Sequence, residues 1–196
     1  HWLWHQSYQE VPLDLERYLS GTTKLWVATT SVVTGEARYF PVDDQNIHNV
    51  LTASCSIPLA YRDYPRVEDE PMSDGGIADS IPVAEAYRRG ARDITVVLSR
   101  PLGYEKKPLA FPALTKRMFR EQPGLAEAII RRGERYNETL EFIRNPPEDC
   151  RLRIIAPPED FPVSRLTTDL NKLDLGYQQG HRAAMAYLAE LAQEVT

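Results

Sequence analysis

The stretch Met72-Ser73-Asp74-Gly75-Gly76-Ile77-Ala78-Asp79-Ser80-Ile81-Pro82 decides how the rest of the sequence is interpreted. An acidic side chain is followed by two glycines, a short run of apolar and small residues, and a proline that can open a helix. Because Gly75 and Gly76 lack a Cβ and tolerate a positive φ, the backbone after Asp74 can bend and approach a neighbouring segment closely. The stretch predicts a carboxylate held at the mouth of a site. The alternative is an ordinary Asp-Gly turn on the surface.

Length and composition describe an ordinary globular chain. The 196 residues suffice for a domain with its own core, and 42% of them are hydrophobic and 26% charged. The net charge of −5 argues against a nucleic-acid-binding surface, which is normally basic. No apolar run approaches the roughly 20 residues that a membrane-spanning helix needs.

Metal and disulfide patterns are missing from the sequence. Cys55 and Cys150 lie far apart and fit no metal-ligand spacing, so we expect two reduced thiols. The four histidines form neither an HxxxH nor an HxxEH pattern. We therefore predict neither a metal site nor a cofactor.

The first part of the chain reads as alternating short elements. A helix is predicted over Pro12–Leu19, strands over Lys24–Thr30 and Ala37–Pro41, and a helix of one to two turns over Ile47–Thr52. The polar stretch Tyr61–Glu70 indicates a short hairpin or a loop that leads to Asp74. Apolar β-branched and aromatic residues dominate the first strand, so we expect it to be buried.

A helix followed by an apolar strand comes next. Pro82–Gly90 has proline at the start of a helix and glycine just past its end, and Ile94–Leu98 is a continuous apolar run. Helix, glycine and buried strand are typical of the second half of a βαβ unit in a parallel sheet.

The character of the sequence changes after Arg100. Helices are predicted over Pro112–Arg120 and Pro123–Arg144, and a strand over Arg151–Ala156. A final helix begins near Leu173–Gly176. Its three-to-four-residue repeat predicts which side chains pack on the sheet: Tyr177, His181, Ala184, Leu188, Leu191 and Val195.

In the order and spacing of its sequence segments, the chain resembles the bacterial branch of the patatin-like phospholipases, a family of serine acyl hydrolases. The matching segments include Ala28-Thr29-Thr30, Thr34-Gly35, Ala53-Ser54-Cys55-Ser56-Ile57-Pro58, Asp74-Gly75-Gly76 and Arg89-Gly90-Ala91. The most specific feature is the pairing of the small-residue segment ending in Pro58 with Asp-Gly-Gly roughly twenty residues later. The resemblance covers most of the chain and points to the C-terminal part of the family's catalytic domain.

The resemblance implies a three-layer α/β/α fold, of the FabD/lysophospholipase-like type, and a Ser-Asp catalytic dyad. In that family the Asp of Asp-Gly-Gly is the partner of the nucleophilic serine, and Asp74 matches that position. The chemistry is reasonable, because a serine hydroxyl becomes a good nucleophile when a carboxylate within hydrogen-bond reach takes its proton. Backbone N–H groups would stabilise the oxyanion.

Two pieces of the family pattern do not occur in these 196 residues. There is no G-x-S-x-G nucleophile elbow and no glycine-rich oxyanion loop. We therefore expect the nucleophilic serine and the N-terminal strands of the fold to lie upstream of this chain, and the chain alone to be inactive. On this interpretation residues 1–100 are the C-terminal part of the catalytic domain, and residues 101–196 are a helical extension with one further strand.

In-chain alternatives are weaker. Ser54, Ser56 and Ser73 lie nearest to Asp74 in sequence, and a Ser56–His48–Asp74 triad can be written, but nothing in the spacing favours it. The acidic residues between positions 63 and 79 lack the pattern of a calcium loop. The basic residues Lys106, Lys107, Arg117 and Arg120 could meet anionic head groups, or they could form an ordinary charged helix face.

The function that we predict is hydrolysis of an acyl lipid or small ester, with Asp74 as the base. The alternative is a truncated or degenerate domain that binds lipid or a partner without catalysis. The two reduced thiols predict a cytoplasmic protein, and an acyl-lipid substrate predicts peripheral contact with a membrane or lipid surface. A sheet that lacks strands exposes an edge, so self-association is also expected.

Overall fold

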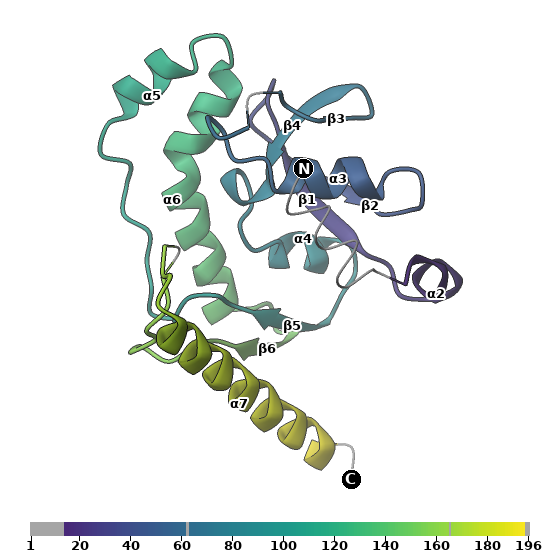
Figure 1. The fold of residues 1–196 in the computed structure, drawn as a ribbon. Helices are drawn as coiled ribbons and strands as arrows, with labels where there is room; N and C mark the ends of the chain where they lie inside the picture. Colours follow the sequence, from purple (N-terminus) through teal and green to yellow (C-terminus); the bar gives the residue numbers. More distant parts are fainter. Residues whose placement is uncertain (1–13, 62, 165, 195–196) are drawn as a thin grey trace. The chain divides into compact units, whose positions relative to one another are not determined.

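The computed structural model describes residues 14–194 except residues 62 and 165. It is a mixed α/β structure whose elements follow one another along the chain as shown in Figure 1. Their bounds are α2 Leu15–Ser20, β1 Trp26–Ser31, β2 Ala37–Pro41, α3 Ile47–Ser54, β3 Arg66–Val67, β4 Glu70–Asp74, η1 Gly75–Ile77, α4 Val83–Arg88, β5 Asp93–Val97, α5 Pro112–Met118, α6 Pro123–Arg144, β6 Arg151–Ile155 and α7 Leu170–Glu194. The first residues of the helix predicted over Pro12–Leu19 lie outside the described residues.

The described chain divides into two compact units. One comprises the residues up to Ser80 together with Ala110–Arg132, and the other comprises Ile81–Leu109 and the residues from Gly133 onward. Helix α6 contributes to both units.

The first unit is built on a four-stranded antiparallel sheet in the order β2-β1-β4-β3. Strand β1 is central, and Thr29 lies opposite Asp74 in the pairing of β1 with β4. One cluster of buried residues joins this sheet to α3: Val27, Phe40, Val42, Ile47, Val50, Ala53, Val67 and Met72. A second cluster joins Val32 and Ile77 to Phe119 and the start of α6. The burial of β1 confirms the prediction for that strand.

The polar stretch before Asp74 is a hairpin, the first of the two alternatives that the sequence left open. Strand β3 pairs with β4, and Glu68 and Asp69 between them adopt positive φ values of 50° and 62°. Such conformations are typical of two-residue hairpin turns. The second strand of the hairpin continues through Pro71 to Asp74, because β4 pairs with β1 on its other side.

The second unit holds a two-stranded parallel sheet of β5 and β6, with Val96 and Leu98 packed against Tyr136, Leu140 and Ile143 of α6. The parallel pairing that the sequence predicted is therefore present, but β5 pairs with the later strand β6 and not with a strand before Asp74. The prediction that this strand is buried is confirmed for one of its faces only. Val96 and Leu98 are buried against α6, whereas Val97 on the opposite face is 71% exposed.

Helix α7 packs only in part through the side chains that were predicted. Tyr177, His181 and Leu188 are exposed, Ala184 and Leu191 are half-buried, and Val195 lies outside the described residues. Gly176 is buried, and Tyr187 contacts Thr95 of β5 through its hydroxyl group. Gly176 allows the helix to come close to the segment around Phe161 and Val163. The hydrophobic stripe therefore marks the packed face only in part.

Candidate functional site

Asp74 is the last residue of β4 and the residue that caps the short helix η1. Its Oδ1 accepts a hydrogen bond from the Gly76 N–H at 2.7 Å, and its side chain is half-buried. The capping contact is what an ordinary Asp-Gly turn would make. The position at the end of a central strand, however, fixes the carboxylate relative to the sheet.

Two hydrogen bonds from other segments hold the main chain of Asp74 in place. The Asp74 N–H donates to the Ser56 carbonyl at 3.0 Å, and the Thr30 hydroxyl donates to the Asp74 carbonyl at 2.8 Å. The same Thr30 oxygen accepts a hydrogen bond from the Ala78 N–H at 3.1 Å. A single fully buried hydroxyl on β1 therefore ties together the two ends of the turn.

The first of the two glycines after Asp74 is required by space, and the second has a tight contact with a side chain. A Cβ on Gly75 would lie 2.1 Å from the Ala28 carbonyl oxygen of β1, and one on Gly76 would lie 3.1 Å from Asp74 Oδ1. The predicted close approach of the backbone is therefore confirmed. Neither glycine uses the positive φ that it would tolerate: among the described residues the glycines with positive φ are Gly35 and Gly90.

An arginine from α6 contacts the turn. Arg132 Nε donates to the Gly76 carbonyl at 2.7 Å, and the Ser80 hydroxyl donates to the same oxygen at 2.7 Å. The guanidinium therefore brings a positive charge to the residue that binds the Asp74 carboxylate. Nothing in the sequence around Arg132 signals this role, because 56 residues separate it from Gly76.

Cys55 lies in the field of the Asp74 carboxylate. It is the residue that follows α3, and its side chain is exposed to solvent. Desolvation by surrounding atoms raises the pKa of its thiol, and the negative charge of Asp74 raises it further. A thiol with a raised pKa is mostly protonated at neutral pH and is a poor nucleophile. The sequence indicated packing for this segment and gave no sign of the proximity to Asp74.

The serines nearest to Asp74 in sequence are held in other contacts. The Ser56 hydroxyl donates to the Thr52 carbonyl at 2.6 Å, and the Ser73 hydroxyl donates to the Ser56 carbonyl at 2.8 Å. Both side chains are almost completely buried. Ser54 ends α3 and is half-buried, and His48 is exposed on the first turn of the same helix. The alternative triad Ser56–His48–Asp74 therefore lacks a nucleophile, because the Ser56 hydroxyl is buried and bonded to the Thr52 carbonyl.

The acidic residues of this region contact protein groups. Glu70 accepts a hydrogen bond from the Ser31 hydroxyl and lies 3.5 Å from the Arg38 guanidinium. Asp79 Oδ2 accepts from the Tyr39 hydroxyl at 2.5 Å. Within residues 14–194, positions 62 and 165 aside, no three His, Cys, Asp or Glu side chains gather as a metal site would require. In the same part of the chain, no helix has both the length and the hydropathy to cross a membrane.

Two segments of this chain match known protein families. Residues 20–87 match the model of the family described as patatin-like phospholipase, and residues 122–195 match that of a domain of unknown function, DUF6363. The first match includes Asp74 and the whole antiparallel sheet, and it lies in the N-terminal part of this chain. The second match includes the whole of α6, β6 and α7, and therefore Arg132.

One curated relative is the uncharacterized protein YjjU of Escherichia coli (strain K12). It is 26% identical to this chain over 200 residues, and the alignment covers 100% of this chain and 56% of the relative. The chain thus spans about half the length of the relative that it matches.

Proposed function

We propose, since residues 20–87 carry the patatin-like phospholipase match, that this chain is part of a serine acyl hydrolase in which Asp74 is the catalytic base. The substrate is an acyl lipid or a small carboxylic ester. The observation that carries the proposal is the position of Asp74 within the matched segment, at the end of a central strand and with its main chain held by Ser56 and Thr30. A base for serine needs such a fixed position, because proton transfer requires hydrogen-bond distance.

The nucleophile in this proposal is a serine outside the 196 residues. No G-x-S-x-G sequence occurs in the chain, and Ser56 and Ser73 are buried and engaged. The relative is considerably longer than the aligned region, which leaves room for an elbow in the remaining part of such a protein. The proposal includes the completed three-layer α/β/α fold, to which that part would add further strands, and a cytoplasmic location.

The test uses the longer protein that contains this chain. Asp74→Asn keeps the size of the side chain and the acceptor for the Gly76 N–H, so we expect normal folding and a loss of p-nitrophenyl ester hydrolysis of 10²-fold or more. The matched control is Asp63→Asn, which removes an exposed carboxylate from the preceding loop. Equal turnover of the Asp74→Asn variant and the control would contradict the dyad.

A serine-directed phosphonate identifies the nucleophile in the same protein. Mass spectrometry should locate the phosphonate on a serine outside residues 1–196. Labelling of Ser54, Ser56 or Ser73, or turnover by the 196-residue chain alone that the phosphonate abolishes, would contradict the assignment.

The second candidate function is a lipid- or partner-binding module without catalysis. It is favoured by the engaged state of Ser56 and Ser73 and by the capping contact of Asp74. The discriminating observation is the sequence of the longer protein. A G-x-S-x-G elbow about a hundred or more residues before Asp74 supports the hydrolase, and its absence supports the module.

We propose that the first unit contacts an anionic lipid surface through helix α5. Leu114 and Met118 of this helix and Phe111, the residue that precedes it, are spaced to share one side and are 55%, 48% and 71% exposed. Lys116 and Arg117 lie in its last turn. Exposed apolar side chains beside basic ones are typical of helices that lie in a membrane interface.

Sedimentation with vesicles of phosphatidylcholine and phosphatidylglycerol tests this contact. Phe111→Asp should reduce the bound fraction several-fold, because it places a negative charge in the apolar stripe. Leu19→Asp on α2 is the matched control, since Leu19 is also an exposed large apolar residue of the first unit. A Phe111→Asp protein that sediments like the control would contradict the role of α5.

A further inference from the structure

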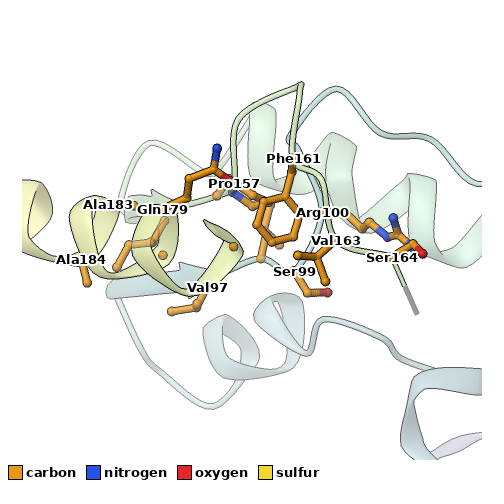
Figure 2. Close-up of a pocket in the computed structure, with 15 residues that line it drawn as sticks. Val97, Ser99, Arg100, Pro157, Phe161, Val163, Ser164, Gln179, Ala183 and Ala184 are labelled. Atoms are coloured by element: carbon orange, nitrogen blue, oxygen red, sulfur yellow. The ribbon is translucent and has the colours of Figure 1, made fainter. Parts of the chain in front are cut away.

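A cavity of about 610 Å³ lies at the carboxyl ends of the parallel strands β5 and β6. Its floor is formed where these strands end, by residues 97–100 and 155–157, and α7 forms a wall (Figure 2). All of its lining residues belong to the second compact unit, so the cavity is separate from the Asp74 turn. Ligands of α/β proteins commonly bind beyond the carboxyl ends of parallel strands.

Most of the lining is apolar. Val97 of β5, Phe161 and Val163 line the space, and α7 contributes Gly180, Ala183 and other small residues. Val97 lines the cavity and is 71% exposed, so its side chain is available to a ligand. A cavity of this size and composition is suited to an aliphatic chain.

The polar groups are few and face the cavity from different sides. Arg100 and Ser164 lie at one side of the cavity, and Gln179 lies at the other (Figure 2). The Arg100 guanidinium lies 5.3 Å from the centre of the Tyr104 ring, which supports it in this position. Among the described lining residues Arg100 is the one that carries a charge, and none of them is acidic.

Gln179 carries a further sign of an unmet polar contact. Its Oε1 atom is buried and accepts no hydrogen bond within the described part of the chain. An aliphatic carboxylate carries no donor for this atom, so the partner that we expect for Gln179 Oε1 is a water molecule in the polar part of the cavity.

We propose that this cavity binds an aliphatic carboxylate of the fatty-acid type. The chain occupies the space lined by Val97, Phe161 and the small residues of α7, and the carboxylate pairs with the Arg100 guanidinium. Arginine is suited to this because its planar fork can donate two hydrogen bonds to one carboxylate. The inference is independent of the proposed ester hydrolysis, since it involves no residue of the Asp74 turn.

The test is calorimetric titration of the 196-residue chain with dodecanoate at concentrations below micelle formation. We expect one binding site. Gly180→Leu should abolish binding, because Gly180 lines the cavity and a Cβ on it meets no atom within 4 Å, so the new side chain fills the space without a clash. Leucine is also the better helix former, so the variant should fold. The matched control is Ala189→Leu, at an exposed position of α7 that does not line the cavity.

The charge is tested separately. Arg100→Gln should weaken dodecanoate binding about tenfold or more and leave the binding of neutral dodecan-1-ol unchanged, while Arg182→Gln on α7 serves as the control. Absence of binding to the wild-type chain, wild-type affinity in Gly180→Leu, or equal weakening of acid and alcohol by Arg100→Gln would each overturn the proposal.

Discussion

Gly75 is the position at which the geometry of the Asp74 turn makes its sharpest prediction. A Cβ added there would lie 2.1 Å from the Ala28 carbonyl oxygen, 2.6 Å from the Ala28 carbonyl carbon and 3.1 Å from the Thr29 nitrogen. All three are backbone atoms of the central strand β1, so no side chain can rotate away. Gly75→Ala therefore requires β1 or the turn to move by roughly 1 Å to reach an ordinary contact.

Such a movement is resisted by contacts on both sides of Gly75. Asp74 is paired with Thr29 in the sheet, and the Thr30 hydroxyl binds both Asp74 and Ala78. Forcing a methyl group into a well-packed interior costs about 1–3 kcal/mol and sometimes more, and the backbone clash places this case near 3 kcal/mol. For a chain of this size the expected loss in melting temperature is about 6–12 °C.

Thermal unfolding followed by circular dichroism measures the effect, with Gly180→Ala as the control. A Cβ on Gly180 meets nothing within 4 Å in helix α7, so this variant should melt at or above the wild-type temperature. The reasoning would be refuted if Gly75→Ala melted within about 2 °C of the wild-type chain, since the clash would then be relieved at almost no cost.

Three further predictions concern other parts of the chain. Asp74→Asn should speed the alkylation of Cys55 by iodoacetamide at pH 8, because removing the carboxylate lowers the raised pKa of the thiol. Mass spectrometry follows the rate. An unchanged rate would show that Asp74 does not influence the pKa of Cys55. The pKa of Glu85 is lowered, first through its hydrogen bond from Arg88, so its stabilising contribution is present above pH 4.5 and is lost as the pH falls through its lowered pKa. Glu85→Gln should therefore flatten the acid limb of a stability–pH profile slightly, and an identical profile would argue against the pairing. Leu140→Ala, at a fully buried position of α6, should lower the free energy of unfolding by about 2–5 kcal/mol in urea titration, and a loss below about 1 kcal/mol would contradict the packing of this cluster.

Long periodic segments were predictable from the sequence. Helix α6 begins at Pro123 and ends at Arg144, as predicted. A regular apolar spacing over 22 residues is a strong indication of a helix. Strand β2 and helix α3 were also predicted at or near their observed bounds. Asp74 was singled out by its two glycines, and the close approach at Gly75 follows from the same feature.

Features that depend on distant partners could not be predicted in this way. Strand β4 contains Pro71 and acidic residues that disfavour a strand, and it forms because β1 and β3 pair with its two sides. The packed face of α7 is marked by Gly176 and not by its larger apolar residues, since small residues permit close contact that hydrophobicity does not signal. Arg132 and Thr30 reach the Asp74 turn from positions more than 40 residues away in sequence.

The contact of Gly35 with Gly124 shows that the two family matches are not separable pieces. A Cβ on Gly35 would lie 2.1 Å from the Gly124 carbonyl oxygen, and one on Gly124 would lie 2.2 Å from the Val33 carbonyl oxygen. Gly35 lies in the patatin-like match and Gly124 in the other match, whose Leu125 and Ala128 complete the core around Val32. The bounds of the family matches therefore differ from those of the compact unit to which both matches contribute. A fragment cut at the end of the patatin-like match would keep the antiparallel sheet and lose the start of α6, which closes the core around Val32.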